Sequence, residues 1–567
     1  MLRSAARFVI VLLPFLLITS CSTTKESTVP DMPTFVPPGM IQDPLASVKV
    51  GTSVLHNQEL GAVANYHFDV VLDYAGHRAQ VSQLVEVINP GPDVWTEIVF
   101  FLPRDLQTPR FTLSTVRLQE QVETNAMQLH LTSDGFLALR LPEDLNPNES
   151  RLVSITYGLE AAQVSLDTRR PMGDVGYGDD VLQFVNWYPR LVPYHPGRGW
   201  ERWVPTDVGP PLLAEVADFQ MKVRAPEGVM VASGGPIERR SNEWQFHMPN
   251  ARTIAFSASP SYEVLTRTEA GVTIYVFYLR EYAFEADDVL AAAAQALVLF
   301  NDQFGHYPYR SLVIAQDAYL SSVASGGLLL HTGRGFDDYS GQPDTLLMSL
   351  LPVTMAQLWW GEVVGYHPLS EPWIGASLAM YSEYLYVERY QSDMRDWYWR
   401  DRVEYWQPAG ALNRTAYDLR TTEELLKNTY RLGAKFLHDL RNSIGEVAFR
   451  KLTRDLFRNS TFKFVSGVQF FDTLRMYSDE YPQIIIDRFF DEMIAMPTLS
   501  PPLTPRPPPG PPATPTPVQR VHVVKHGETL IGISVQYEVP LQMIIDRNHI
   551  SDRTMIQVGR ELVIPYP

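Results

Sequence analysis

The pattern of apolar and polar residues changes near residue 280 of this 567-residue chain. From about residue 60 to 265, apolar and polar residues alternate in short runs, as at 66–72 and 218–223, and Pro, Gly, Asn and Asp separate the runs. Alternation with a period of two predicts strands with one buried face. From about 280 to 495 the apolar residues recur at helical spacing. We therefore predict an N-terminal antiparallel β lobe followed by a mainly α-helical lobe.

Several segments of the second lobe carry the helical pattern. Residues 285–300 are rich in Ala and Leu, and residues 346–360 are apolar on nearly every side, which predicts a buried helix. Further helices are predicted at 373–383, 425–440 and 444–458.

The last 47 residues form a third pattern, with a short β-type segment at 521–524 and a closing strand at 561–565. Between them, apolar residues at helical spacing predict two short helices, the first carrying Leu530 and Ile533 and the second carrying Ile544. The predicted order is therefore β-α-α-β, a small α+β module at 521–567.

Three motifs in this module resemble the LysM domain over its whole length. They are V-x-x-G-x-T-L-x-x-I at 524–533, N-x-I-S-D at 548–552 and G-x-x-L-x-I-P at 559–565. The resemblance implies binding of N-acetylglucosamine polymers, such as peptidoglycan or chitin, in a groove between two loops. It places the glycan contacts at Gly527, Glu528, Thr529, Leu530, Asn548, His549, Ile550 and Ser551. The alternative for Gly527 and Thr529 is a role in turn formation and helix capping alone.

Proline is concentrated ahead of this module, since 11 of the 44 prolines lie within residues 497–517. Proline fixes φ and lacks an N–H, so this segment favours extended polyproline II and reaches roughly 65 Å. A ligand for an SH3-like partner is the alternative. We assign residues 497–520 as a linker between domains.

The N-terminus has the pattern of an export signal. Arg3 and Arg7 precede an apolar run of 11 residues at 8–18, which is too short to span a bilayer of about 30 Å as a helix. The run leads to Cys21, and this resembles the bacterial lipoprotein signal. The resemblance implies a signal peptide at 1–20, acyl chains on Cys21 and a polar, Pro-rich tether at 21–45. One acyl chain holds a membrane marginally, whereas two or three hold it stably.

We therefore expect an exported protein that is lipid-anchored to a bacterial membrane and faces the cell wall or periplasm. An ordinary secretory signal that happens to contain a cysteine is the alternative.

Composition narrows the function classes further. The formal net charge is −17, which argues against a broad nucleic-acid surface because phosphate binding needs basic patches. Cys21 is the single cysteine, so an internal disulfide and a Cys-based zinc cage are excluded. With 45% hydrophobic residues the chain has enough apolar mass for a large core.

The body, over roughly residues 60–480, resembles the aminopeptidase N-like zinc metallopeptidases, or gluzincins. The resemblance rests on local segments: NWYP at 186–189, AFSAS at 255–259, FGHYPY at 304–309, WWG at 359–361, the helix at 373–383 and YRLGA at 430–434. It implies a β-rich domain at 46–265 and a thermolysin-like α-helical domain at 266–496.

The zinc motif of that family is replaced in this chain. The family carries H-E-x-x-H immediately before a Q-W-W-G-like segment, with the two histidines on one helix face as Zn²⁺ ligands and the glutamate as general base. The aligned residues here are Val353 and Gln357 at the histidine positions and Thr354 at the glutamate. Ala376 stands at the third ligand, a glutamate in the family. No H-E-x-x-H occurs anywhere in the sequence.

Two further family positions complete this comparison. Ala324 aligns with the glutamate that binds the substrate amine, and Tyr430 aligns with the transition-state tyrosine. Without a metal, Tyr430 has no oxyanion to stabilise, so we interpret it as a packed helix residue. The histidines of the helical lobe show no pair at ligand spacing, and no G-x-S-x-G elbow is present.

We therefore expect no cofactor and no metal, and a non-catalytic aminopeptidase-like scaffold attached to a glycan-binding module. An active metallopeptidase with atypical ligands, acting at the envelope, is the alternative. A third hypothesis is that the body binds a peptide or protein without cutting it.

Overall fold

The computed structural model describes residues 63–118, 129–165, 174–178, 180–203, 206, 208, 213–478, 482–491, 520–525, 528–537, 539, 541–550 and 559–564. The chain divides into two compact units, Met1–Ala495 and Met496–Pro567, and each is described by itself. The predictions for residues 1–20, Cys21, the tether at 21–45 and nearly all of the 497–520 linker lie outside the described residues.

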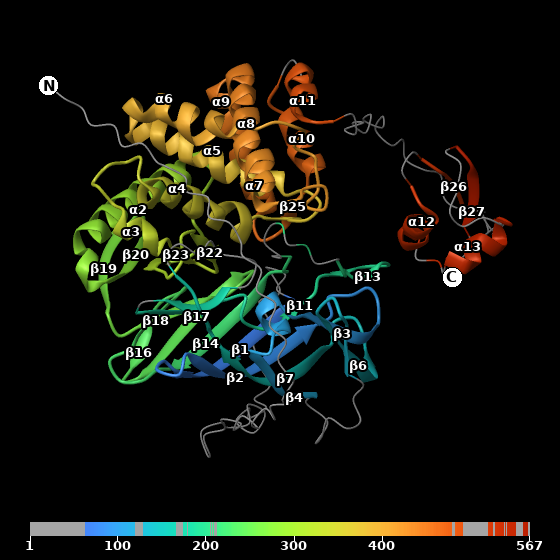
Figure 1. Cartoon of the computed structure of the whole chain (residues 1–567), viewed down its shortest axis with the longest axis horizontal. Helices are drawn as coiled ribbons and strands as arrows, with labels where there is room; N and C mark the ends of the chain where they lie inside the picture. The colour runs from blue at the N-terminus through green and yellow to red at the C-terminus, as the bar shows by residue number, and fades with distance from the viewer. Residues whose placement is uncertain are drawn as a thin grey trace, which may run out of the picture. The chain divides into compact units, whose positions relative to one another are not determined.

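A seven-stranded sheet forms the base of the first unit (Figure 1). Its order is β16 (Glu238–Arg240), β17 (Glu243–Ala251), β14 (Ala217–Arg224), β1 (Ala64–Asp73), β2 (Arg78–Ile88), β7 (Ser150–Glu160) and β4 (Phe111–Leu118). Every second residue of β1 is buried, which confirms the strand expected from the alternating pattern. One pair departs from an antiparallel arrangement, because β1 and β14 run parallel. The long stretch of chain between them supplies the crossover that a parallel pair needs.

Two further sheets and a two-stranded hairpin, β12 (Tyr194–His195) with β13 (Gly199–Trp200), complete the β lobe. One has four strands: β11 (Arg190–Leu191), β3 (Trp95–Phe101), β6 (Phe136–Leu145) and β5 (Leu129–Leu131). The other has five: β15 (Met230–Ser233), β18 (Phe256–Ser259), β10 (Val181–Val185), β9 (Asp174–Gly178) and β8 (Ala162–Gln163). Aromatic rings fill the space between sheets, with Phe68 and Trp187 at 4.8 Å and Tyr66 and Phe219 at 4.9 Å between centroids. The NWYP segment therefore belongs to the core.

The second lobe begins with a sheet and not with helices. Its strands are β19 (Tyr262–Glu269), β20 (Val272–Leu279), β21 (Ser311–Gln316), β23 (Leu328–His331) and β22 (Val323–Ser325). Every residue of β21 is buried, so this strand has no alternating pattern. Its continuous apolar run of four residues, 312–315, is compatible with a strand or a buried helix alike, so periodicity alone does not identify this strand.

The helices of this lobe lie between and after the strands of this sheet in the chain, and most of them form the upper part of the unit in Figure 1. They include α2 (Ala283–Gln303), α4 (Leu346–Gln357), α5 (Trp373–Tyr390), α8 (Leu432–Ile444), α9 (Glu446–Ser460), α10 (Gly467–Arg475) and α11 (Gln483–Phe489). The predicted buried helix at 346–360 ends at Gln357 and continues as a π-helical segment, η4 (Leu358–Val363). Trp359 of that segment contacts Tyr307 at 5.0 Å between centroids, so the WWG and FGHYPY segments meet in one core.

The predicted helix at 425–440 is divided by a second π-helical segment. It consists of α7 (Thr422–Leu425), η8 (Leu426–Arg431) and the first part of α8. A π-helical turn inside an α-helix often marks a functional position, and this one contains Tyr430.

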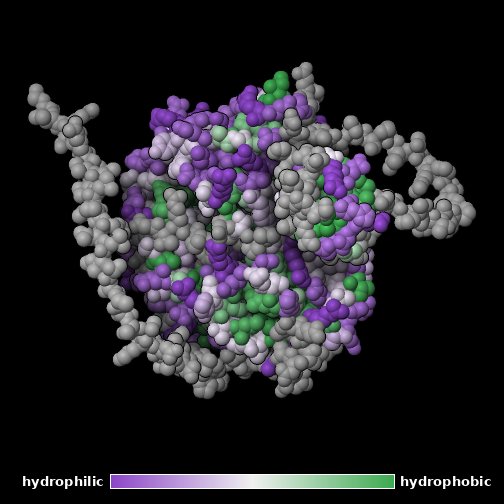
Figure 2. Space-filling view, turned by 45° about the vertical axis from the view of Figure 1, so that its right-hand side comes forward, coloured by the Kyte–Doolittle hydropathy of each residue, from purple (hydrophilic) through white to green (hydrophobic). Residues whose placement is uncertain are grey.

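The surface of the described residues is mainly hydrophilic on the face that Figure 2 shows, with smaller hydrophobic patches between the charged residues. Among the helices that the structure describes, none is long and apolar enough to cross a membrane.

The second unit has the predicted β-α-α-β order. It contains β26 (Arg520–Val523), α12 (Leu530–Tyr537), α13 (Leu541–Arg547) and β27 (Glu561–Ile564), and the two strands pair antiparallel. Its core consists of aliphatic residues from α12, α13, β27 and the adjoining loops: Val524, Leu530, Ile533, Val539, Ile544, Ile545, Ile550, Leu562 and Ile564.

Candidate functional site

The first loop of the small unit is held by its own side chains. Thr529 accepts a hydrogen bond from the Gly532 N–H (3.1 Å) at the start of α12, and Leu530 is buried in the core. Thr529 therefore caps the start of α12.

Glu528 is fixed from two sides. Its Oε2 accepts from the Lys525 N–H at 2.7 Å and bonds the buried His522 ring at 2.8 Å. These two hydrogen bonds hold the pKa of Glu528 below its usual value. The other ring nitrogen of His522 bonds the Tyr537 hydroxyl at 3.0 Å. Tyr537 was expected only as a residue of the first predicted helix, and no role was predicted for His522, a histidine inside the apolar segment that opens the module.

The second loop is held by Asn548. Its amide nitrogen donates to the carbonyls of Ile544 and Val563, both at 2.8 Å, and its amide oxygen accepts from the Val563 N–H at 2.6 Å. His549 adopts a positive φ of 50°, and Ile550 is buried in the core. Gly527 and Ser551 lie outside the described residues. The described side chains therefore hold the two loops in shape. A ligand in the expected groove would contact the backbone and the exposed surface of these loops.

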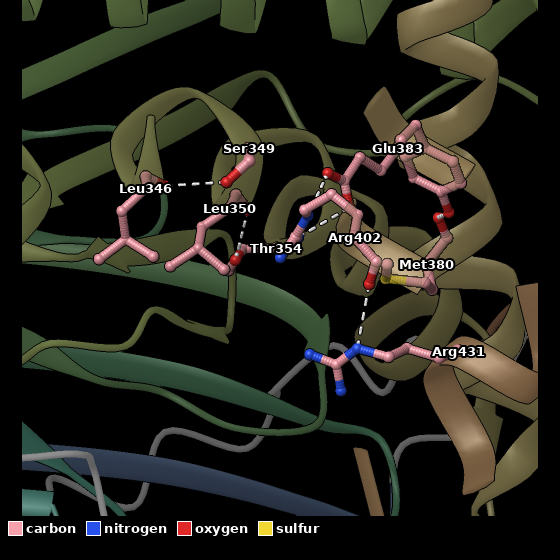
Figure 3. Close-up of polar contacts among 9 residues, drawn as sticks. Leu346, Ser349, Leu350, Thr354, Met380, Glu383, Arg402 and Arg431 are labelled. Carbon is pink, nitrogen blue, oxygen red and sulfur yellow. Dashed lines mark hydrogen bonds and ion pairs between the residues drawn. The ribbon is translucent and has the colours of Figure 1, made fainter. Parts of the chain in front are cut away.

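In the first unit, α4, α5 and β22 carry the residues aligned with the peptidase site. The side chains of Val353, Thr354, Ala376 and Ala324 are all buried. The Thr354 hydroxyl donates to the Leu350 carbonyl of its own helix at 2.9 Å (Figure 3). Thr354 is therefore turned into α4 and bonded there.

The structure brings Gln357 and Tyr430 together. The Gln357 Nε2 donates to the Tyr430 hydroxyl at 3.2 Å, although 73 residues separate them in the chain. Burial raises the pKa of Tyr430, so its hydroxyl stays protonated at neutral pH. Tyr430 is thus a half-buried, hydrogen-bonded residue of η8.

These residues do not fit the zinc ion that the sequence resemblance implies. A catalytic zinc needs three side chains with lone pairs that converge on one point. Val353 and Ala376 have no atom that could bind a metal, and Gln357, whose amide nitrogen donates to Tyr430, offers only an amide oxygen, which is a weak zinc ligand. Within the residues that the structure describes, no group of three or more His, Cys, Asp and Glu side chains is arranged to hold a metal.

The histidines of the helical lobe have other partners. His331 is fully buried between Ser322 (2.9 Å) and the Leu347 carbonyl (3.0 Å), and burial lowers its pKa to about 4. His367 bonds Glu201 at 2.7 Å, and His438 bonds the Tyr381 hydroxyl at 3.2 Å. These three imidazole rings do not meet at a common point where they could bind one metal ion.

An ion pair that the sequence analysis did not single out lies on α5, two turns beyond Ala376. Glu383 is 1% exposed, and Arg402 donates to both of its carboxylate oxygens, at 2.8 and 2.9 Å (Figure 3). The Glu383 carboxylate raises the pKa of Arg402. The backbone carbonyl of Arg402 accepts a further bond from Arg431, the residue after Tyr430. The available signal was a glutamate within the mainly apolar stretch 373–387 of this helix.

Comparisons with known proteins agree with this architecture. A family model for the LysM domain matches residues 522–565. Aminopeptidase N of Lactobacillus delbrueckii subsp. lactis is 22% identical over 297 residues, which cover 48% of this chain and 35% of the relative. Aminopeptidase N of Streptomyces lividans is 23% identical over 283 residues, covering 43% and 32%. The matched part of this chain thus spans about a third of the length of these relatives.

Among solved structures, the M1 zinc metallopeptidase of Deinococcus radiodurans is similar over 80% of this chain and 97% of its own, with a TM-score of 0.53 and 18% identity. A variant of that enzyme bound to a Tyr-Ser-Ala substrate gives a TM-score of 0.52 at 18% identity, over 75% of this chain and 93% of its own. The chain therefore has an M1 peptidase-like multidomain fold, with a β-rich lobe and a helical lobe. It ends in a LysM domain.

Proposed function

We propose that this protein is a lipid-anchored component of the cell envelope that binds N-acetylglucosamine glycans through its LysM domain and carries a non-catalytic M1-like scaffold. The glycan part is supported by the LysM match at residues 522–565. The anchor rests on the sequence around Cys21.

One observation carries the non-catalytic assignment. The positions of the metal ligands hold Val353, Ala376 and a Gln357 amide that is bonded to Tyr430. A buried cluster of carboxylates and imidazoles needs a metal to balance its charge, whereas these uncharged side chains do not. The replacements thus fit a stable, metal-free interior.

Anchor and LysM domain act together in this proposal. A single LysM site binds glycan weakly. When the lipid anchor already holds the protein near the wall, the effective concentration of glycan around the LysM domain is higher. The Pro-rich segment at 497–517 supplies a semi-rigid spacer of roughly 65 Å. The M1-like body is thereby held at the wall.

Metal analysis and turnover test the scaffold assignment. We expect the purified full-length chain to contain no stoichiometric zinc and to release no product from aminoacyl or peptide substrates. As a positive control, the combined substitution Val353→His, Thr354→Glu, Gln357→His and Ala376→Glu restores the family ligand set and should raise zinc content. Stoichiometric zinc with chelator-sensitive hydrolysis in the unaltered chain would show that the body is an enzyme with atypical ligands.

Sedimentation with purified peptidoglycan tests the glycan assignment. The full-length chain should be enriched in the pellet, and a chain that ends at residue 519 should not. Equal enrichment of the two proteins contradicts a LysM-dependent interaction.

A further inference from the structure

Arg431 occupies a fixed position beside the degenerate peptidase site. It is the last residue of η8, directly after Tyr430, and it is only 8% exposed. Its Nε donates to the Arg402 carbonyl at 3.1 Å, and its guanidinium carbon lies 4.4 Å from the centre of the Trp406 ring. One edge and one face of the guanidinium are therefore occupied, which fixes its orientation.

Among the described residues, no carboxylate forms a hydrogen-bonded ion pair with Arg431. Two guanidinium groups, those of Arg402 and Arg431, stand beside the single buried carboxylate of Glu383, and Arg402 takes both of its oxygens. The Glu423 carboxylate attracts the Arg431 guanidinium electrostatically, without a hydrogen bond. Buried charges in proteins are normally paired, so this arrangement is unusual.

The terminal nitrogens of Arg431 are available. Within the described part of the chain, its hydrogen bond from Nε is the sole one it makes, and neither terminal nitrogen is sealed from solvent. Figure 3 shows them directed away from Glu383. Burial and the neighbouring Arg402 lower the pKa of Arg431 to about 10, so it keeps its charge at neutral pH.

We propose that Arg431 anchors a carboxylate of a bound peptide. This inference rests on the proposed non-catalytic scaffold, because it concerns a peptide that is held and not cut. A guanidinium whose Nε edge is occupied presents its two terminal nitrogens in a fork that matches the two oxygens of a carboxylate. The partly exposed Trp406 beside it offers an apolar wall for the neighbouring part of the peptide. Inorganic phosphate shares the anionic chemistry, so the test includes it.

Isothermal titration calorimetry on the full-length chain measures this site. The probes are the tripeptide Tyr-Ser-Ala with a free C-terminus, the same tripeptide as its C-terminal amide, and inorganic phosphate. We expect the free acid to bind about tenfold to a hundredfold more tightly than the amide. The Arg431→Met variant should lose that preference.

Arg400→Met is the matched control. It removes the same charge from an exposed arginine of the neighbouring π-helical segment η6 (Tyr398–Val403), where Arg400 pairs with the adjacent Asp401. This variant should keep the preference for the free acid. If Arg431→Met does not fold, the acid-to-amide ratio of the unaltered chain and the Arg431→Lys variant decide the question.

Three results would overturn the proposal. They are equal binding of acid and amide, absence of saturable binding of the acid, and phosphate binding that depends on Arg431 and is tighter than that of the tripeptide. Release of free tyrosine in the same samples would instead refute the non-catalytic scaffold, and it is read independently of the acid-to-amide ratio.

Discussion

The buried ion pair of Arg402 and Glu383 gives the sharpest stability prediction. Arg402→Met keeps the length of the side chain and the backbone carbonyl that Arg431 uses, but removes both hydrogen bonds to Glu383. The carboxylate that remains is 1% exposed. Hydrogen bonds to charged groups contribute about 1.5–3 kcal/mol each. The loss of two such hydrogen bonds agrees with the decrease of about 3–5 kcal/mol in the free energy of unfolding that follows when one partner of a buried ion pair is removed.

Urea denaturation followed by circular dichroism measures this loss as a lower midpoint. Arg400→Met is again the control, because Arg400 is exposed and its ion pair should contribute less than about 1 kcal/mol. Burial raises the pKa of Glu383, so the deficit of Arg402→Met should shrink as the pH is lowered and the carboxylate becomes protonated. The combined variant Arg402→Met and Glu383→Leu removes both charges and should recover most of the stability. The reasoning is wrong if Arg402→Met destabilises the chain no more than Arg400→Met does.

Three further predictions concern other parts of the chain. Burial raises the pKa of Glu201, but hydrogen bonds from His367 and His195 outweigh it and lower that pKa from 4.5 to about 2. Its contribution to stability is therefore complete above pH 4.5 and is lost as the pH falls toward 2; thermal melts of Glu201→Gln should lack this dependence. Asn548→Ala removes three hydrogen bonds from the LysM domain and should destabilise it by about 2–4 kcal/mol, measured as earlier loss of amide protection in 520–564; unchanged protection contradicts this. Cys21→Ser should release the protein from membranes on fractionation, and unchanged retention would disprove the anchor.

Local patterns in the sequence were sufficient for much of the fold. The alternation around β1, the helical spacing of α2 and α9, and the β-α-α-β order of the LysM domain are all present in the structure. Each of these depends on residues within a few positions of one another, because the periods of strand and helix are local properties. The residues aligned with the zinc ligands were also identified from short motifs.

Other features depend on contacts between distant segments. Every residue of β21 is buried, so its sequence shows no alternation from which a strand could be predicted. The parallel pairing of β1 with β14 joins residues about 150 positions apart. The bond from Gln357 to Tyr430 and the stacking of Arg431 on Trp406 likewise arise when separate helices pack.

The sequence by itself determined that Val353 and Ala376 bring no metal-binding atom, wherever they lie in the fold. The tertiary structure alone decided which charges come together. Glu383, Arg402 and Arg431 stand on three segments with no shared motif, and within the described part of the chain their meeting leaves the Arg431 guanidinium with no carboxylate in hydrogen-bond contact. A charge balance is a property of a volume in the folded protein, and residues enter that volume through packing and not through their order in the chain.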